Sequence, residues 1–361
     1  MQGRLVNMIE PGVLEFREYE VPDPGPGALV ARIIRSNICG SELHIWGGHH
    51  PTKKQGGLGH ETVAVVDKLG PGTTHDNAGE PLREGDRIVA TYFIHCRRCY
   101  ACSKGQFWLC INAYKYWAQQ PDDAPHFHAT FATHWYIHPD QTVFKVPDTV
   151  SDKAAASANC ALSQVYFGLD LAHLSYGDTL VIQGAGGLGL NAAAVAKEKG
   201  AEVIVIDAVA RRLQVARRFG ADHVIDMNDY PTTEARVDAV MGLTAGRGAD
   251  YCMEVAGVVE AFAEGTRLLR TGGTLISVGT LNPGQTVAYD PGYSLRRGVT
   301  IIPALRYYGP YLKKSMEFLQ DTKDKYPHDE LLDVDYPLDD VAQALRDSAA
   351  RKVTRASLVV S

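Results

Sequence analysis

Four cysteines form the most specific chemical pattern in the chain, with the spacing Cys96-x2-Cys99-x2-Cys102-x7-Cys110. Four thiolates so spaced can close tetrahedrally around zinc, and a closed shell of four sulfurs is structural rather than catalytic. A bacterial iron–sulfur run places its fourth cysteine after three residues and before proline, whereas Ile111 follows here. Disulfides need an oxidising compartment, and the N-terminus lacks the apolar stretch of an export signal. The pattern therefore predicts a structural zinc site.

A second set of ligand-type side chains, Cys39, His60 and Cys160, is scattered along the sequence. A single cysteine or histidine is more often packed in a core than bound to a metal. Together, the three would supply two thiolates and an imidazole and leave the fourth position of a tetrahedral zinc open, as catalytic zinc sites do. Glu61, which follows His60, can enter as an alternative ligand or tune this site from close by. We therefore predict a catalytic zinc site and count Glu61 with its catalytic residues.

Polar residues beside Cys39 suit proton transfer at such a site. Ser41 lies two residues after the cysteine, where its hydroxyl can take a proton from an alcohol. His44 can pass that proton to solvent. Glu42 can accept a hydrogen bond from the second ring nitrogen of His60.

The segment Gly184-Ala185-Gly186-Gly187-Leu188-Gly189 fits the pattern G-x-G-x-x-G between a strand-like and a helix-like run. The first glycine permits a tight turn, the second lets a pyrophosphate approach the backbone, and the third allows close packing of helix and strand. The helix N-terminus, which includes Gly187 and Leu188, offers free N–H groups to the phosphates. By itself this pattern is weak, because glycines between a strand and a helix often only make a turn.

Asp207 strengthens the prediction of a dinucleotide site. It ends the next strand-like run, where an acidic residue accepts the ribose hydroxyls of NAD. A carboxylate there would repel a 2′-phosphate, so NAD is favoured over NADP. Arg211 and Arg212 follow closely and can soften that preference.

Alternating strand-like and helix-like runs predict the elements that would position these residues. Apolar runs indicate strands at 180–182, 203–206, 223–225, 250–254, 274–278 and 299–302, with helices at 188–199 and 210–219. Continuous apolar strands separated by helices imply a parallel sheet covered on both faces. Six of them would make a doubly wound nucleotide-binding domain.

The rest of the chain has a different pattern. Up to about residue 150, short apolar runs such as 29–34, 62–66 and 87–90 alternate with turn residues, which indicates a β-rich domain. After residue 303 the pattern predicts helices at 311–320 and 339–350 and a strand at 355–360.

Composition limits the classes of function. At 361 residues the chain fits two domains, and its content of 45% hydrophobic and 22% charged residues is typical of soluble globular proteins. The net charge of −6 argues against nucleic acid as a partner. No run approaches the roughly 20 apolar residues of a membrane span, so we expect a cytoplasmic protein.

The chain resembles the zinc-containing medium-chain dehydrogenase/reductase family, which includes the alcohol dehydrogenases. The resemblance rests on motifs in family order along the whole chain, namely residues 39–44 (CGSELH), 59–61 (GHE), 85–87 (GDR), the four-cysteine lobe, 160–163 (CALS) and the glycine loop. It implies a GroES-like catalytic domain at 1–162 and 304–361, with the zinc lobe at about 92–118. It also implies a Rossmann domain at 163–303.

The resemblance also implies residue roles and an activity. Cys39, His60 and Cys160 would be catalytic zinc ligands, and Ser41 with His44 the proton relay. Arg355 falls where relatives hold the NAD pyrophosphate, and Arg212 where they hold the adenosine ribose. The implied protein is a zinc-dependent, NAD-linked dehydrogenase of secondary alcohols, with two zinc ions per chain. It would form a homodimer or homotetramer through the cofactor domains.

The motifs resemble those of more than one subfamily. Cys160 is the third ligand of alcohol dehydrogenases, whereas CGSELH is more similar to butanediol and threonine dehydrogenases. Residues 290–320 and Asn159-Cys160 also resemble dehydrogenases associated with phosphonate catabolism, which suggests an anionic substrate. An aldehyde reductase or dismutase of the same fold, and a non-catalytic NAD-binding protein, are the alternatives.

Substrate contacts are expected mainly from aromatic and basic residues. Trp46 and Arg306 are the main candidates, because Arg306 can hold a carboxylate or phosphonate bidentately. Further candidates are His49, His50, Tyr92, Trp117 and Tyr307. The spacing of His126, His128, His134 and His138 is not a metal motif, so we expect solvated loop or strand histidines there. Cys252 is expected in the core.

Overall fold

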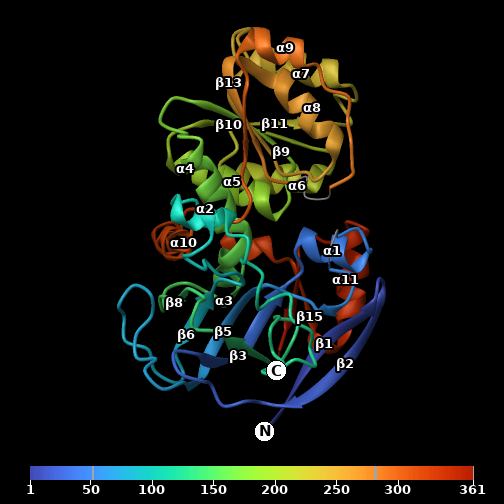
Figure 1. Ribbon diagram of the computed structural model, residues 1–361. Helices are drawn as coiled ribbons and strands as arrows, with labels where there is room; N and C mark the ends of the chain where they lie inside the picture. The colour runs from blue at the N-terminus through green and yellow to red at the C-terminus, as the bar shows by residue number, and fades with distance from the viewer. Residues whose placement is uncertain (51–52, 280–282, 361) are drawn as a thin grey trace. The chain divides into compact units, whose positions relative to one another are not determined.

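The computed structural model describes residues 1–50, 53–279 and 283–360. Contacts divide the chain into two units. The terminal unit consists of Met1–Ser163, Tyr308–Asp324 and His328–Ser361. The central unit consists of Gln164–Tyr307 and Lys325–Pro327. Figure 1 labels many of the helices and strands of both units.

The described residues of the central unit form a six-stranded parallel sheet with the order β11-β10-β9-β12-β13-β14. Its strands are β9 (Thr179–Gln183), β10 (Glu202–Asp207), β11 (His223–Asp226), β12 (Ala249–Glu254), β13 (Leu269–Ser277) and β14 (Thr300–Pro303). The first strand lies in the middle and the order reverses beside it, as in Rossmann sheets. The predicted fold class is confirmed.

Helices cover both faces of this sheet. They are α4 (Ser163–Leu171), α5 (Gly187–Glu198), α6 (Ala210–Arg218), α7 (Thr233–Leu243), α8 (Val259–Leu268) and α9 (Pro291–Arg297). A Cβ on Gly189 of α5 would touch Ile182, whereas one on Gly265 of α8 would touch Gln183. Neighbouring residues of a strand point to opposite faces, so α5 and α8 pack on opposite sides of β9.

The terminal unit is built around antiparallel pairing. Its strands are β1 (Gln2–Glu10), β2 (Val13–Glu20), β3 (Leu29–Asn37), β4 (Gly56–Gly57), β5 (Glu61–Leu69), β6 (Arg87–Ala90), β7 (His134–Ile137), β8 (Val143–Lys145), β15 (Val334–Pro337) and β16 (Ala356–Val359). One sheet of the described residues has the order β2-β1-β4. The larger sheet has the order β15-β16-β3-β5-β6-β8, with β7 also paired to β3.

Helices of the terminal unit complete its core. They are α1 (Gly40–Trp46), α2 (Tyr100–Ser103), α3 (Asp152–Ala156), α10 (Pro310–Asp321) and α11 (Val341–Ala349), with 3₁₀ turns η1 (Phe107–Leu109), η3 (His328–Leu331) and η4 (Leu338–Asp340) and a π-helical turn η2 (Ala158–Leu162). Val341, Ala344 and Leu345 of α11 are buried at helical spacing against Ile45 and Leu358. The C-terminal segment therefore belongs to the same core as the N-terminal one. Within the described residues, no helix is both long and apolar enough to span a membrane.

A buried ion pair joins two helices of the central unit. Arg236 of α7 donates from Nε to both carboxylate oxygens of Glu264 of α8, at 3.1 and 3.0 Å. Glu264 also accepts hydrogen bonds from Gln183 Nε2 of β9 at 3.1 Å and from Thr233 Oγ1 at 3.0 Å. Both charged residues are 7% exposed. The pair thus ties both helices to the central strand of the sheet.

Arg236→Met should destabilise the protein by about 3–5 kcal/mol, because it leaves the Glu264 carboxylate buried without its counterion. Urea unfolding followed by circular dichroism measures this loss. The matched control is Arg267→Met, which breaks the exposed pair of Arg267 with Glu234 and should cost less than about 1 kcal/mol. Equal losses in the two variants would contradict the structural role of the buried pair.

Candidate metal and nucleotide sites

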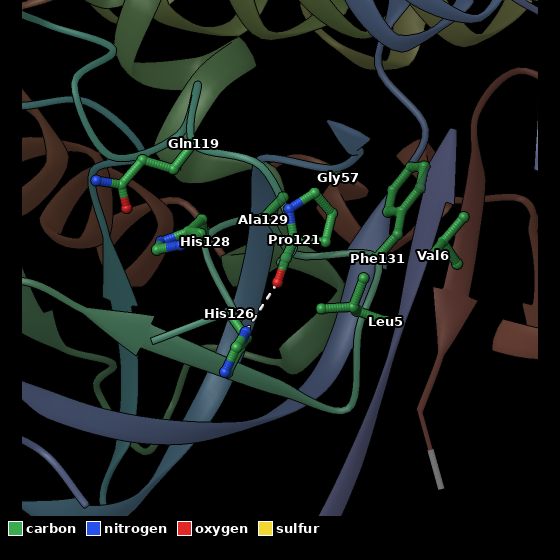
Figure 2. Close-up of a pocket in the computed structure, with 9 residues that line it drawn as sticks. All are labelled: Leu5, Val6, Gly57, Gln119, Pro121, His126, His128, Ala129 and Phe131. Atoms are coloured by element: carbon green, nitrogen blue, oxygen red, sulfur yellow. Dashed lines mark hydrogen bonds between the residues drawn. The ribbon is translucent and has the colours of Figure 1, made fainter. Parts of the chain in front are cut away.

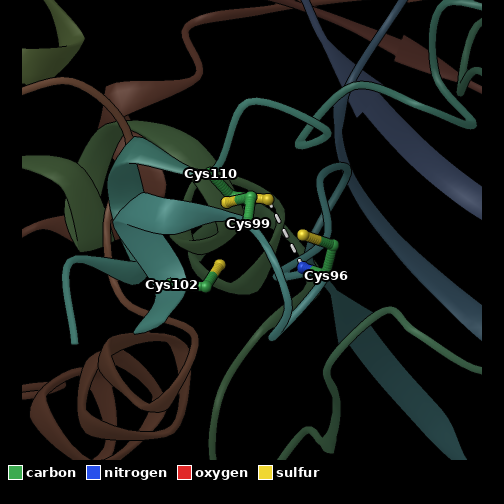
Figure 3. Close-up of side chains that lie close together, drawn as sticks. All are labelled: Cys96, Cys99, Cys102 and Cys110. Carbon is green, nitrogen blue, oxygen red and sulfur yellow. Dashed lines mark hydrogen bonds between the residues drawn. The ribbon is translucent and has the colours of Figure 1, made fainter. Parts of the chain in front are cut away.

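The four predicted thiols of the lobe lie together in the terminal unit. The Sγ atoms of Cys96, Cys99, Cys102 and Cys110 all lie within 4.8 Å of one another, and Figure 3 shows the four side chains gathered beside α2. The backbone N–H of Cys96 donates to Cys110 Sγ at 3.3 Å, and Asn112 Nδ2 donates to Cys96 Sγ at 3.3 Å. The sulfur atoms of Cys96 and Cys110 therefore accept hydrogen bonds from N–H groups, as metal-bound thiolates do.

Thiol acidity within the lobe is uneven. Burial raises the pKa of Cys102 to about 12. Burial also acts on Cys96, but the hydrogen bond from Asn112 helps to lower the pKa of that thiol to about 6. The four sulfur atoms lie close enough together to bind one tetrahedral zinc ion. The lowered pKa of Cys96 favours the thiolate form that zinc binds.

A second cluster joins residues that are far apart in the sequence. The ligand atoms of Cys39, His60, Glu61 and Cys160 all lie within 4.8 Å of one another, and all four residues are buried. Cys39 directly precedes α1, His60 precedes β5, and Cys160 lies in the π-helical turn. Insertions of this π type are frequent at functional sites, because they redirect side chains out of helical register.

Imidazole nitrogen and sulfur converge in this cluster. His60 Nε2 lies 3.3 Å from Cys160 Sγ and 3.5 Å from Ser41 Oγ. The hydrogen bond with Cys160 holds the pKa of Cys39 well below its usual range, whereas the same bond raises the pKa of Cys160. Two thiols and an imidazole at this spacing fit zinc, with Ser41 as the adjacent hydroxyl.

Glu42 positions two members of the cluster at once. One carboxylate oxygen accepts the backbone N–H of Cys39 at 3.0 Å, and the other pairs with His60 Nδ1. Burial acts to lower the pKa of His60, but the charge of Glu42 raises it well above its usual value. With Nδ1 held by a carboxylate, Nε2 is left facing the thiols, as in the carboxylate–histidine arrangement of zinc sites.

Glu61 occupies a buried position with a cationic partner. Its Oε1 accepts the N–H of Ala161 at 3.1 Å, and its Oε2 pairs with the guanidinium of Arg355. Burial raises the pKa of Glu61 to about 7, although Arg355 lowers it. The sequence did not predict this pair, because 294 positions separate the two residues. The motifs around Glu61 and Arg355 contain no signal that the two side chains meet. The pyrophosphate role of Arg355 stays a prediction.

Aromatic rings surround the imidazole of His60. The ring centres of Tyr92 and Trp117 lie 4.4 and 6.2 Å from that of His60. His44 is half-buried, and burial lowers its pKa. Trp46 is partly buried, and among the described residues its Nε1 has no hydrogen-bond acceptor. The structure thus brings the predicted Tyr92 and Trp117 to the cluster.

Arg306, the other main substrate candidate, lies in the central unit and is 7% exposed. Its backbone adopts a left-handed conformation with φ of 57°. Such a conformation is unusual for a residue with a side chain and is often found at functional positions. Cys252 is fully buried, as expected.

The glycine loop connects β9 to α5 in the central unit. Gly184 has φ of 107°, which favours glycine. A Cβ on Gly189 would lie 1.8 Å from Gly184 O, whereas one on Gly186 would meet nothing within 4 Å. The first helical turn can therefore pack on the strand, while the backbone at Gly186 stays open to a ligand. This geometry fits a pyrophosphate.

Asp207 ends β10 next to this loop. Its carboxylate accepts the backbone N–H of Ala185 at 2.7 Å and that of Val209 at 2.8 Å. The carboxylate therefore ties the glycine loop to the following strand. Each oxygen keeps a further lone pair, so ribose hydroxyls can still donate to it.

Two histidines of the histidine-rich stretch are buried, contrary to our expectation, whereas His126 and His138 are partly exposed. His128 and His134 are 5% and 4% exposed. His128 lines a small pocket with apolar residues such as Leu5 and Phe131 (Figure 2). His126 bonds to the carbonyl of Pro121. The prediction of solvated histidines was wrong for His128 and His134, because both pack against apolar side chains that come from other segments of the chain. Among the described residues these histidines form no metal-type cluster.

Comparison with known proteins identifies the family to which the chain is similar. The model of the alcohol dehydrogenase GroES-like domain matches residues 25–148, and that of the zinc-binding dehydrogenases matches residues 187–321. The 5-exo-hydroxycamphor dehydrogenase of Pseudomonas putida is 30% identical over 95% of this chain and 94% of its own. The L-threonine 3-dehydrogenase of Pyrococcus abyssi is 33% identical over 82% of this chain and 78% of its own.

Solved structures agree with the sequence relatives. An alcohol dehydrogenase from Thermotoga maritima superposes over 100% of both chains with a TM-score of 0.93 and 28% identity. The fold, the motifs and the full-length similarity lead to one conclusion. The chain belongs to the zinc-containing medium-chain dehydrogenase/reductase family, as an oxidoreductase of the alcohol dehydrogenase type that acts on CH–OH groups.

Proposed function

We propose that this protein is a zinc-dependent, NAD-linked dehydrogenase that reversibly oxidises a small polar secondary alcohol. The observation that carries the proposal is the buried cluster of Cys39, His60 and Cys160, with Ser41 Oγ 3.5 Å from His60 Nε2. Two thiolates and one imidazole leave an open position on zinc for an alcohol oxygen. Two of the relatives, which act on hydroxycamphor and threonine by name, are likewise dehydrogenases of secondary alcohols.

When bound, zinc would supply a Lewis acid for the alcohol oxygen, and NAD would supply the hydride acceptor. Ser41 takes the hydroxyl proton of the alcohol, since its Oγ lies beside the cluster. His44 passes this proton toward solvent, because its ring is half-buried close to Ser41 in the sequence and burial lowers its pKa. Glu42 holds His60 in a fixed orientation throughout. Glu61, whose carboxylate lies in the same cluster, would be an alternative zinc ligand.

NAD would bind to the central unit. Its pyrophosphate would lie on the N–H groups of Gly186, Gly187 and Leu188, and its adenosine ribose on Asp207 and Arg212. Arg355, which the resemblance assigns to the pyrophosphate, pairs with Glu61 within the terminal unit. In domain terms, residues 163–303 bind the nucleotide, and residues 1–162 and 304–361 provide the chemistry.

Assembly into a homodimer or homotetramer through the nucleotide-binding domains is part of this proposal. β14 lies at the edge of the central sheet, and Ile301 on it is 37% exposed. An open edge strand with apolar side chains favours pairing with another chain.

Cys39→Ala should lower kcat roughly 1,000-fold or more, because a ligand of the catalytic zinc is lost. NADH binding, measured by fluorescence titration, should stay near that of the wild type. Cys252→Ala is the control, since Cys252 is also buried but lies in the central unit. Retained turnover in Cys39→Ala with a panel of secondary alcohols would refute the assignment of this cluster as the catalytic site.

Asp207→Gly should reduce the preference for NAD over NADP at least about tenfold, since the carboxylate that repels a 2′-phosphate is removed. The ratio of kcat/KM for the two cofactors measures it. Because Asp207 also holds the loop, Asp207→Asn separates charge from hydrogen bonding. An unchanged cofactor ratio in both variants would contradict the role of Asp207.

Cys110→Ser should lower the zinc content from two ions per chain to one, because the closed sulfur shell loses a ligand. Elemental analysis of the purified protein provides the count. Cys160→Ser is the matched variant, and it should lose the other zinc ion. The lobe variant should also show a lower Tm. Two zinc ions in Cys110→Ser would contradict the zinc lobe.

A further inference from the structure

Lys53 is a buried lysine in the segment that connects the two ligand-bearing elements of the cluster. It lies after α1, which follows Cys39, and before β4, which precedes His60. Lys53 is only 8% exposed. Its backbone N–H donates to His50 Nδ1 at 2.9 Å. Burial of an ammonium group costs free energy unless the charge is compensated, so this position requires an explanation.

Trp117 connects the Lys53 ammonium to the cluster. Lys53 Nζ donates to the carbonyl oxygen of Trp117 at 3.0 Å and lies 3.7 Å from the centre of its ring. The ring of Trp117 in turn lies 6.2 Å from that of His60. The ammonium therefore lies at most about 10 Å from the centre of the His60 ring. A small bifunctional molecule can span this distance.

The charge of Lys53 has no carboxylate partner among the described residues. The ion pairs found there do not include Lys53, and its one described acceptor is a neutral carbonyl. The carboxylate whose charge acts on the Lys53 ammonium is that of Glu42. Its two oxygens already accept hydrogen bonds from Cys39 and His60. Burial lowers the pKa of Lys53 to about 7, although Glu42 raises it. An anion beside the ammonium would restore its full charge and use its remaining N–H donors.

We propose that Lys53 binds an anionic group of the substrate, a carboxylate or a phosphonate, while the carbinol end of the same molecule reaches Ser41. This inference rests on the proposed function and narrows its substrate class to hydroxy acids or hydroxyphosphonates and the corresponding ketones. Lys53 takes no part in proton or hydride transfer. The face of Trp117 holds the ammonium in place through a cation–π contact.

Acid and ester pairs test this assignment. The substrates are 3-hydroxybutyrate, compared with its neutral methyl ester, and 2-hydroxypropylphosphonate, compared with its neutral dimethyl ester. The variants are Lys53→Met, which removes the charge, and Lys53→Arg, which restores it. Lys54→Met is the matched control, because Lys54 is the next residue and its Nζ donates to Gly48 O at the surface. Acetoacetate binding in the presence of NAD⁺, measured by calorimetry, gives a readout independent of turnover.

We expect the wild type to prefer at least one acid over its ester. Lys53→Met should then raise KM for that acid and the Kd of acetoacetate roughly 10- to 100-fold. Its kinetics with the ester should stay unchanged. Lys53→Arg should recover part of the loss, and Lys54→Met should behave as the wild type. A wild type that prefers the esters would overturn the proposal, as would equal losses for acid and ester in Lys53→Met.

Failure of the proposed function has a different signature. A zinc-loaded wild type that oxidises neither acids nor esters would refute the dehydrogenase proposal. The calorimetric comparison would still decide the role of Lys53 in that case. Acetoacetate binding that is lost in Lys53→Met but kept in Lys54→Met supports the anion site. The absence of acetoacetate binding to the wild type excludes it.

Discussion

The carboxylate of Glu42 is the constraint on which the candidate catalytic cluster depends. It lies on the first turn of α1 and holds both the backbone of Cys39 and the ring of His60. One side chain therefore sets the position of a thiol and the orientation of an imidazole that come from different elements. Since a zinc site tolerates little misplacement of its ligands, this fixed acceptor lets distant segments form one site before any metal binds.

A second constraint is the presence of several charged side chains in the buried interior of the terminal unit. Glu61 and Arg355 form a buried pair beside the thiols, and Lys53 adds an ammonium near Trp117. Charges in such a place interact strongly, since little water screens them. The pair of Glu61 and Arg355 is balanced within the chain, whereas Lys53 has no described carboxylate. The pair of Glu61 and Arg355 therefore stabilises the site, whereas Lys53 is suited to bind an anionic ligand.

Local sequence patterns predicted the central sheet well. Val203–Ile206 and similar apolar runs are long and continuous, because strands buried on both faces need apolar side chains at every position. The hairpin of β1 and β2 was missed, since β2 alternates exposed charged residues such as Glu18 with partly buried ones. The burial of His128 and His134 was also missed, because burial depends on what packs over a strand rather than on its own residue types.

The sequence by itself determined which chemistry was available: the four-cysteine spacing, the glycine loop and the Cys-His-Cys set are local or compositional, and ligand chemistry follows from residue type. Only the tertiary structure decided which charges meet. Glu61 with Arg355, and Lys53 with Trp117, are separated by 294 and 64 positions, and no periodicity of the chain encodes such pairs. They arise because strand pairing and core packing bring distant segments together, and electrostatic interaction depends on distance in space.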